Sequence, residues 1–544
     1  MKIYCIAVLS VGIFYIVDKF GKRLYVVYGC YRHHIINIRL FEILGYYKNI
    51  KNNSNSLDKL LILEYNNHNS VSIVEGESDM FIGRKSELKL LENLYARDDF
   101  QFLVMYGRRR VGKTSLLQEF SKKHRTILFS AQEKNDALNL EDFSKTIQRH
   151  FDGSFFGTFS GWETAFQYIG DKTSNEKTVL IIDEFPFVAG ENPSVKSILQ
   201  HTIDHSWKEK NIFLILCGSS VSFMENEVMG YKSPLYGRST SQLEVQSFDY
   251  YDSSLFFPNY SNVDKLLAYG ILGGIPCYLN TFRDTLSIEQ NIAEQILRTG
   301  AFLKDEPQLL LKMELREPAV YNSIFEVIAE GASRLNDIAL KTHEESQKCS
   351  KYISTLQTIK LIERITPCGD DASSKKSLYK IADNFYLFWY RFVFANRSYY
   401  EMLGDEEAAA EITENLSAYM GSVFETICCQ YLIRLAKQRK LPFIPHDIGR
   451  WWGANPKTKK QDDIDILALS RNRESAIFCE CKFKNAAFDM KEYDDFICAS
   501  EIFTQPKNRY YYLFSKGGYT SAVRERAERE NVILVEIDDL FRFE

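Results

Sequence analysis

The chain has 544 residues, of which 45% are hydrophobic and 26% are charged. Its length suits about three domains, and its composition excludes collagen-like, largely disordered and channel-forming proteins. There are 67 Lys and Arg against 72 Asp and Glu, so the net charge of −5 excludes a globally basic nucleic-acid binder. The 11 cysteines include no CxxC pair. We therefore expect them to be small core residues in a reducing, cytoplasmic environment.

The first 79 residues are an extension of uncertain role. Residues 3–17 form an apolar run that is shorter than the roughly 20 residues of a spanning helix, although it would suit a signal-peptide core. No small-x-small cleavage site follows. Residues 46–70 are rich in Asn, Lys, Ile and Tyr, as upstream sequence would be if translation starts later, and Met80 lies just before the first strong motif. A misassigned start and a membrane-facing segment both stay open, and we expect no stable membrane insertion.

A phosphate-binding loop is predicted at residues 107–114. The apolar residues 103–106 have the pattern of a buried strand, and they lead into GRRRVGKT and then an amphipathic helix. In this context G-x4-G-K-T predicts a P-loop, whose backbone amides and helix N-terminus bind phosphate. We expect Lys113 to contact the β and γ phosphates of ATP, and the Thr114 hydroxyl to ligate Mg²⁺. The residues expected to contact the nucleotide here are Gly107, Arg108, Arg109, Arg110, Val111, Gly112, Lys113, Thr114 and Ser115.

A second predicted strand supplies two carboxylates to the same site. Residues 179–182 are wholly apolar and are followed by Asp183 and Glu184. Parallel strands that are buried on both faces bind ligands at their C-terminal edge. We therefore expect Asp183 to hold Mg²⁺, largely through water, and Glu184 to orient or deprotonate the attacking water.

Serine and arginine residues complete the predicted nucleotide site. The apolar residues 212–216 lead to Ser219 and Ser220, either of which could contact the γ-phosphate or form a turn. Arg238 could supply positive charge to a hydrolytic transition state, within the chain or from a neighbouring subunit, or it could face solvent. Arginines 108–110 could contact phosphate or pair with acids, but we expect two of the three to face solvent.

These motifs resemble those of archaeal-type ATPases, which belong to the STAND branch of P-loop ATPases and are related to the AAA+ class. The resemblance covers about residues 80–300, and it is carried by residues 81–84, 106–114, 180–184, 234–238 and 274–276. It implies that Ile82, Gly83 and Arg84 lie near the adenine end of the site. It also implies that Pro276, in a Gly-x-Pro element of a helical lid, lies near the nucleotide.

A winged helix is predicted after the lid. Helices are expected at 321–329, 335–341 and 346–358, and wing strands at 361–366 and 378–381. The third helix carries lysines but is preceded by two glutamates, so its charge does not require DNA binding, and a regulatory role stays open. The aromatic residues 384–393 follow, and we expect them to form core rather than a stacking platform.

A last α/β domain is predicted from about residue 400, in the order helix, strand, strand, helix, strand. Asp465 and Glu480 would meet at the ends of two adjacent strands, with Lys482 on the same face as Glu480. Two carboxylates can hold Mg²⁺, and a lysine beside them can stabilise charge that develops on a phosphodiester.

This constellation resembles the PD-(D/E)XK nuclease core, and the region resembles the uncharacterised domain that commonly follows archaeal-type ATPases. The resemblance implies that Glu425 is a helix-borne acid, that Asp465 and Glu480 are metal ligands, and that Lys482 is the catalytic lysine. The domain has more acidic than basic residues, which argues against strong DNA binding. The local basic loop expected beside the site consists of Arg450, Lys457, Lys459 and Lys460.

The predicted fold is thus α/β: a P-loop ATPase core at 80–245, a helical lid at 246–310, a winged helix at 311–399 and a restriction-endonuclease-like domain at 400–544. The main prediction is an ATP-binding ATPase whose Mg-ATP hydrolysis switches the winged helix and the nuclease-like module. The alternatives are an ATP-gated, metal-dependent DNA nuclease and a nucleotide-dependent signalling scaffold with an inert nuclease fold. ATP is the expected ligand, while DNA and a second copy of the chain are candidate partners.

Overall fold

The chain divides into two units, Met1–Phe81 and Ile82–Glu544. The strands of the first unit are antiparallel. The computed structural model describes residues 4–8, 11–17, 24–30, 60–66, 70–76, 81–173, 177–455, 459 and 461–543. In the first unit, β1 (Tyr4–Val8), β2 (Val11–Val17) and β3 (Leu24–Cys30) form one sheet, and β4 (Leu60–Asn66) pairs with β5 (Ser70–Gly76). The apolar run at 3–17 therefore contains two paired strands instead of a single helix.

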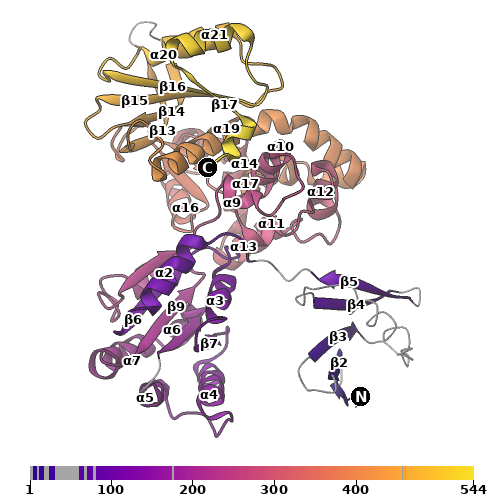
Figure 1. The fold of residues 1–544 in the computed structure, drawn as a ribbon, viewed down its shortest axis with the longest axis vertical. Helices are drawn as coiled ribbons and strands as arrows, with labels where there is room; N and C mark the ends of the chain where they lie inside the picture. The colour runs from indigo at the N-terminus through magenta and orange to yellow at the C-terminus, as the bar shows by residue number, and fades with distance from the viewer. Residues whose placement is uncertain are drawn as a thin grey trace. The chain divides into compact units, whose positions relative to one another are not determined.

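A parallel five-stranded sheet organises the first part of the second unit (Figure 1). Its strands are β6 (Gln101–Tyr106), β7 (Thr126–Ser130), β8 (Thr178–Asp183), β9 (Ile212–Gly218) and β10 (Ser241–Glu244). They lie in the order β10-β6-β9-β8-β7, and every neighbouring pair is parallel. The three strands predicted from apolar runs are confirmed as β6, β8 and β9.

Helices cover both faces of this sheet. They are α2 (Lys85–Tyr95), α3 (Lys113–Ser121), α4 (Asp136–Asp152), α5 (Trp162–Lys172), α6 (Phe185–Glu191), α7 (Ser194–Thr202) and the short α8 (Val221–Phe223). Val104, Leu180 and Leu214 belong to the core on the side of α4 to α7. On the other side, Phe213 contacts Phe120 of α3 with ring centroids 6.1 Å apart. Successive strand residues point to opposite faces of the sheet. Because helices cover both faces, β8 and β9 are buried along their whole length.

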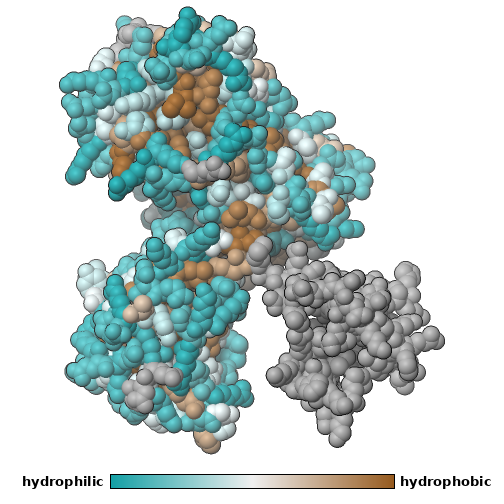
Figure 2. All heavy atoms as spheres, viewed as in Figure 1, coloured by the Kyte–Doolittle hydropathy of each residue, from teal (hydrophilic) through white to brown (hydrophobic). Residues whose placement is uncertain are grey.

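A helical segment follows the sheet. Its helices are α9 (Tyr250–Ser254), α10 (Asn262–Leu272), α11 (Pro276–Leu279), α12 (Ile288–Ile292) and α13 (Glu306–Glu314). Leu309 and Met313 of α13 are exposed, and Figure 2 shows apolar surface in the region where Figure 1 draws α11 and α13. This segment overlaps the predicted lid, 246–310, and extends to residue 314 in α13. It is called the lid below, and its action as a lid stays a prediction.

Three helices and an antiparallel hairpin come next, in the predicted order. They are α14 (Pro318–Ala329), α15 (Leu335–Lys341), α16 (Ser346–Thr358), β11 (Ile362–Ile365) and β12 (Leu378–Ile381). The aromatic residues that follow form α17 (Asn384–Phe388) and a π-helical turn (Trp389–Phe394), and most of them are buried. Their predicted role as core is confirmed. The helix α18 (Arg397–Leu403) leads into the last part of the chain.

The C-terminal part is a mixed sheet between helices. Its elements are α19 (Asp405–Lys437), β13 (Asp447–Ala454), β14 (Gln461–Leu469), β15 (Ser475–Lys482), α20 (Met490–Ser500), β16 (Asn508–Ser515), α21 (Ser521–Glu530) and β17 (Ile533–Glu536). The sheet order is β13-β14-β15-β16-β17, with antiparallel pairs up to β15 and parallel pairs after it. The predicted order of elements was incomplete, since it lacked β13, α21 and β17.

The strand β13 explains one error in the sequence prediction. Its sequence DIGRWWGA does not alternate between apolar and polar residues, and its pairing shifts register between Gly449 and Trp451. Arg450 therefore lies in an edge strand and not in the predicted basic loop. Lys457 and Lys460 lie outside the described residues.

The long helix α19 joins the C-terminal sheet to the lid (Figure 1). Arg434 pairs with Asp249 at 2.5 Å and with Asp252 at 2.9 Å, at the start of α9. The Tyr419 hydroxyl donates to the Gly270 carbonyl of α10 at 2.7 Å. Lid and C-terminal residues thus share one apolar core. Across the described ranges, we find no helix with the length and apolar character needed to cross a membrane.

Two glycines give a test of a close backbone approach inside the lid. A Cβ on Gly274 would lie 1.9 Å from the Phe248 carbonyl oxygen, so Gly274→Ala should lower the free energy of unfolding by about 2 kcal/mol or more. Gly421 lies within α19, and an added Cβ there would have nothing within 4 Å. Gly421→Ala should therefore raise the free energy of unfolding by about 0.5–1 kcal/mol. Denaturant unfolding of the full chain measures both changes, and equal effects would contradict the close approach at Gly274.

Candidate functional site

The loop after β6 surrounds the ammonium group of Lys113. This side chain is buried at the start of α3, and its Nζ donates to the carbonyl oxygens of Gly107 at 2.8 Å and Arg108 at 2.9 Å. Burial lowers the Lys113 pKa below its usual value. Gly112 caps α3 with φ 88°, a left-handed conformation that glycine adopts without strain. An added Cβ there would lie 3.5 Å from Pro276, so this proline packs beside the loop, and its contact with the nucleotide stays a prediction.

The two predicted acids lie at the end of β8 beside α3. The Thr114 hydroxyl donates to Asp183 Oδ2 at 2.9 Å, and Asp183 is buried. Glu184 adopts a left-handed backbone conformation with φ 52°. Its Oε2 accepts from both the backbone amide of Ser219, at 3.1 Å, and the Ser219 hydroxyl, at 2.9 Å. The structure thus brings Thr114, Asp183, Glu184 and Ser219 together at one edge of the sheet.

The segment before α2 contacts this loop from the other side. Arg84 donates from Nη2 to the Val111 carbonyl at 2.8 Å, and its guanidinium lies 4.1 Å from the ring centroid of Phe248. A Cβ on Gly83 would lie 2.8 Å from the same ring. Sequence reasoning missed Phe248, because nothing in its local pattern indicates contact with a segment more than 160 residues earlier. The nucleotide contacts expected of Ile82, Gly83 and Arg84 stay a prediction.

The three consecutive arginines of the loop all pair with acids. Arg108 lies 2.7 Å from Asp383, Arg109 lies 3.1 Å from Glu314, and Arg110 lies 2.8 Å from Glu306. The expectation that two of the three face solvent is therefore wrong. The partners are about 200 residues or more away in the sequence, so no local pattern could indicate them.

Arg238 is engaged within its own chain. Its Nε and Nη2 donate to Asp204 Oδ2 at 3.0 and 2.7 Å, and its Nη1 donates to the Pro234 carbonyl at 2.9 Å. These contacts hold the guanidinium on Asp204, and its predicted catalytic role stays a prediction.

A second group of charged residues lies in the C-terminal domain. Ile466 pairs with Cys479 across β14 and β15, so Asp465 and Glu480 come next to this pair on adjacent strands. Asp465 Oδ2 accepts from the Cys481 amide at 2.8 Å, and Glu480 forms an ion pair with Lys482. The sequence therefore predicted this juxtaposition correctly.

Glu425 of α19 completes this carboxylate group. Burial and then the charge of Asp465 raise the pKa of Glu425 to about 7, and the same two causes raise the pKa of Glu480 to about 7. Burial also raises the pKa of Asp465. Arg450 lies 3.8 Å from Glu425 and 2.5 Å from Asp463. Within the part of the chain that the structure describes, no three His, Cys, Asp or Glu residues converge closely enough to hold a metal ion.

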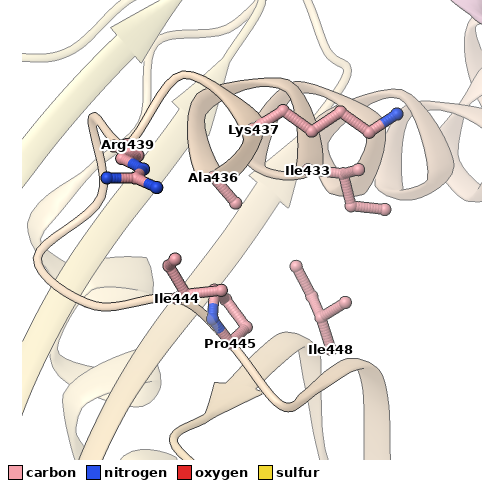
Figure 3. Close-up of a pocket in the computed structure, with 7 residues that line it drawn as sticks. All are labelled: Ile433, Ala436, Lys437, Arg439, Ile444, Pro445 and Ile448. Atoms are coloured by element: carbon pink, nitrogen blue, oxygen red, sulfur yellow. The ribbon is translucent and has the colours of Figure 1, made fainter.

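An apolar pocket of about 370 Å³ lies elsewhere on the C-terminal domain (Figure 3). Ile433, Ile444, Pro445 and Ile448 point toward one another across it. None of the residues that line it belongs to either charged group.

Comparison with known proteins places the chain in a family. Residues 81–282 match a family described as an ATPase domain predominantly from Archaea, and residues 389–493 match a family of archaeal and bacterial proteins of unknown function. An uncharacterized protein of Methanocaldococcus jannaschii is 35% identical over 416 residues, which span 76% of this chain and 89% of that protein. The chain belongs to the archaeal-type ATPase family.

Further likenesses are more limited. An uncharacterized ATP-binding protein of Methanocaldococcus jannaschii is 46% identical over 41 residues, which span 8% of this ATPase and 70% of that protein. A solved Walker-type ATPase of Pyrococcus abyssi is 19% identical, with 58% of this chain and 97% of that chain covered and a TM-score of 0.45. The Orc2 protein of Aeropyrum pernix, solved in ADPNP–ADP complexes, is 12% identical, with 60% and 98% covered and a TM-score of 0.39.

The raised pKa of Glu425 gives a pH-dependent test. The folded protein holds a proton on Glu425 up to about pH 7, whereas the unfolded chain releases it near pH 4.5, so ionisation opposes folding increasingly between these values. Glu425→Gln should therefore gain stability relative to wild type as pH rises from 5 to 8, reaching about 1–3 kcal/mol. Denaturant unfolding in EDTA measures this gain. The matched control is Glu414→Gln, at an exposed position of α19, and a difference independent of pH would contradict the assignment.

Proposed function

We propose that this protein is a Mg²⁺-dependent ATPase whose hydrolysis cycle rearranges the segments that follow its ATPase core. The observation that supports this most directly is the convergence of Lys113, Thr114, Asp183, Glu184 and Ser219 at the C-terminal edge of β6, β8 and β9. This is the edge at which parallel sheets bind ligands. This edge carries the Lys113 ammonium, which can bind phosphate, the oxygens of Thr114 and Asp183, which can bind a metal ion, and the carboxylate of Glu184.

Each residue has a role that follows from its chemistry. Lys113 binds the β and γ phosphates as a point charge, and the amides at the start of α3 bind phosphate oxygens. Thr114 and Asp183 offer hard oxygen ligands 2.9 Å apart, and they would hold Mg²⁺, which neutralises phosphate charge. Glu184 orients the attacking water and accepts its proton. Ser219, which donates twice to Glu184 Oε2, keeps this carboxylate in position.

The rearrangement is supported by where the loop arginines bind. Their partners Glu306, Glu314 and Asp383 belong to α13 and to the segment before α17. The loop that would bind the phosphates thus contacts the parts of the chain that follow the sheet, and a change in this loop can reach them directly.

The wing hairpin supports a regulatory rather than a DNA-reading role for the predicted winged helix. The loop between β11 and β12 is bound to the C-terminal domain: the Cys368 amide donates to the Arg450 carbonyl at 2.9 Å, and Trp452 Nε1 donates to the Lys376 carbonyl at 3.1 Å. Arg473 donates to the Gly369 carbonyl at 2.6 Å. These contacts occupy the loop that a winged helix would place on DNA.

Two substitutions separate nucleotide binding from hydrolysis. Lys113→Ala should abolish hydrolysis and greatly weaken ATP binding, because it removes the charge on the phosphates. Glu184→Gln should keep ATP affinity and slow hydrolysis by roughly 100-fold or more, because it keeps the shape and removes the base. A fluorescent ATP analogue measures affinity, and phosphate release measures turnover. Unchanged turnover in a folded Lys113→Ala variant would contradict the proposal.

A second candidate function is an ATP-gated DNA nuclease at Asp465, Glu480 and Lys482. The observation that favours it is the position of two half-buried carboxylates, Asp465 and Glu480, next to each other on adjacent strands, because such oxygen donors are the ones that Mg²⁺ or Mn²⁺ prefers. Lys482 beside them would stabilise charge on a phosphodiester. Since no group of three acids in the described ranges converges as a metal site, we give this function second place.

Plasmid nicking by the full chain with ATP and Mn²⁺ tests this second function. Asp465→Ala should remove both Mn²⁺ binding and nicking, because a ligand is lost. Lys482→Ala should keep Mn²⁺ binding and lose nicking, because the lysine acts on the transition state. Equal background from wild type and Asp465→Ala would favour a nucleotide-dependent scaffold with an inert nuclease fold.

A further inference from the structure

Three ion pairs tie the P-loop to two later segments. Arg110 and Arg109 pair with Glu306 and Glu314, the first and last residues of α13, so they hold both ends of this helix. Arg108 pairs with Asp383, which lies between β12 and α17. The side chains of Glu306 and Asp383 are only 1% and 3% exposed. The pairs of Arg108 and Arg110 are therefore not solvated surface pairs, whereas the side chains of Arg109 and Glu314 are 35% and 26% exposed. The three arginines are neighbours in the predicted phosphate-binding loop.

The two buried acids keep other partners when an arginine leaves. Asp383 Oδ1 accepts from the backbone amides of Phe385 and Tyr386, at 2.8 and 3.1 Å, and so caps α17. Glu306 accepts from the Tyr278 hydroxyl at 3.1 Å. A buried carboxylate with no partner would be costly, but neither acid is left in that condition. These hydrogen bonds lower the free energy that is needed to open the pairs.

The backbone at Arg110 depends on its ion pair. Arg110 has φ 68°, a left-handed conformation that costs a non-glycine residue energy and persists when surrounding contacts enforce it. Glu306 holds its Nε, and the guanidinium also lies 4.5 Å from the ring centroid of Phe302. The loop conformation and the position of α13 are thus linked.

Phosphate and carboxylate compete for arginine, because each presents two anionic oxygens that can accept the paired N–H donors of a guanidinium group. We propose that the pairs Arg108–Asp383, Arg109–Glu314 and Arg110–Glu306 form a latch, which the phosphates of bound nucleotide open by taking over the arginines. This inference rests on the proposed function, since it needs nucleotide at the P-loop. Opening frees α13 and the β12–α17 segment. The wing loop that contacts β13 lies directly before β12, so the latch connects the nucleotide to the C-terminal domain.

Hydrogen exchange of the full chain, with and without Mg-ATP, tests the latch. In wild type, Mg-ATP should slow exchange at residues 107–121 and speed it at 306–314 and 378–386. Without nucleotide, Glu314→Gln should speed exchange at 306–314 and Asp383→Asn should speed it at 378–386. Each variant should bind ATP on the order of five-fold more tightly, because one carboxylate fewer competes for the loop arginines. Asparagine can still cap α17, which protects the fold of the second variant.

The matched control is Asp305→Asn. Asp305 adjoins α13 and pairs with Arg397 at 2.8 Å, so the change removes an equal charge beside the helix without touching the P-loop. This variant should have wild-type ATP affinity. The latch is wrong if 107–121 becomes protected while 306–314 and 378–386 do not change, or if the two latch variants bind ATP more weakly. Absence of protection at 107–121 in wild type would instead overturn nucleotide binding itself, and the latch with it.

Discussion

The parallel pairing of β6, β9 and β8 is the constraint on which the nucleotide site depends. In this register Tyr106 lies opposite Gly218, and Ile182 lies opposite Leu216, so the three strands end at nearly the same level. The P-loop, the acids and Ser219 then come together although they are far apart in sequence. A slip of one residue in β8 would turn Asp183 away from Thr114, because strand side chains alternate between faces. The burial of β8 and β9 on both faces makes such a slip costly.

The C-terminal domain depends in a similar way on the lid. The helix α19 contributes Met420 and Val423 to an apolar core that also contains Leu266 of α10. Arg434 adds a charged link to the start of α9. Separating the two parts would expose this core to water, so the natural unit of study is the whole chain from the ATPase core onward. The lid is therefore a structural partner of the C-terminal sheet as well as a neighbour of the P-loop.

Sequence patterns could predict what is local and not what is distant. The P-loop, the strand ending at Asp183 and the pair Asp465 and Glu480 each lie in a short stretch whose periodicity indicates the structure. The partners of the loop arginines could not be found in this way, since Arg108 and Asp383 are 275 positions apart. The choice between the two serines was also undecidable, because only the turn after β9 determines that Ser219 contacts Glu184. The edge strand β13 lacked any alternating pattern, so its existence came from the structure alone.

The left-handed backbone of Glu184 has a consequence for how this family can change. Glycine would adopt that conformation without strain, but it would lose the two hydrogen bonds that Glu184 accepts from Ser219. If Glu184 is the base proposed above, keeping glutamate there trades some stability for activity. A lineage that no longer needed hydrolysis could relax this strain in a single substitution and still keep Lys113 and Thr114. Under that proposal, a nucleotide-binding regulator and a hydrolysing enzyme would differ at one strained position at the end of β8.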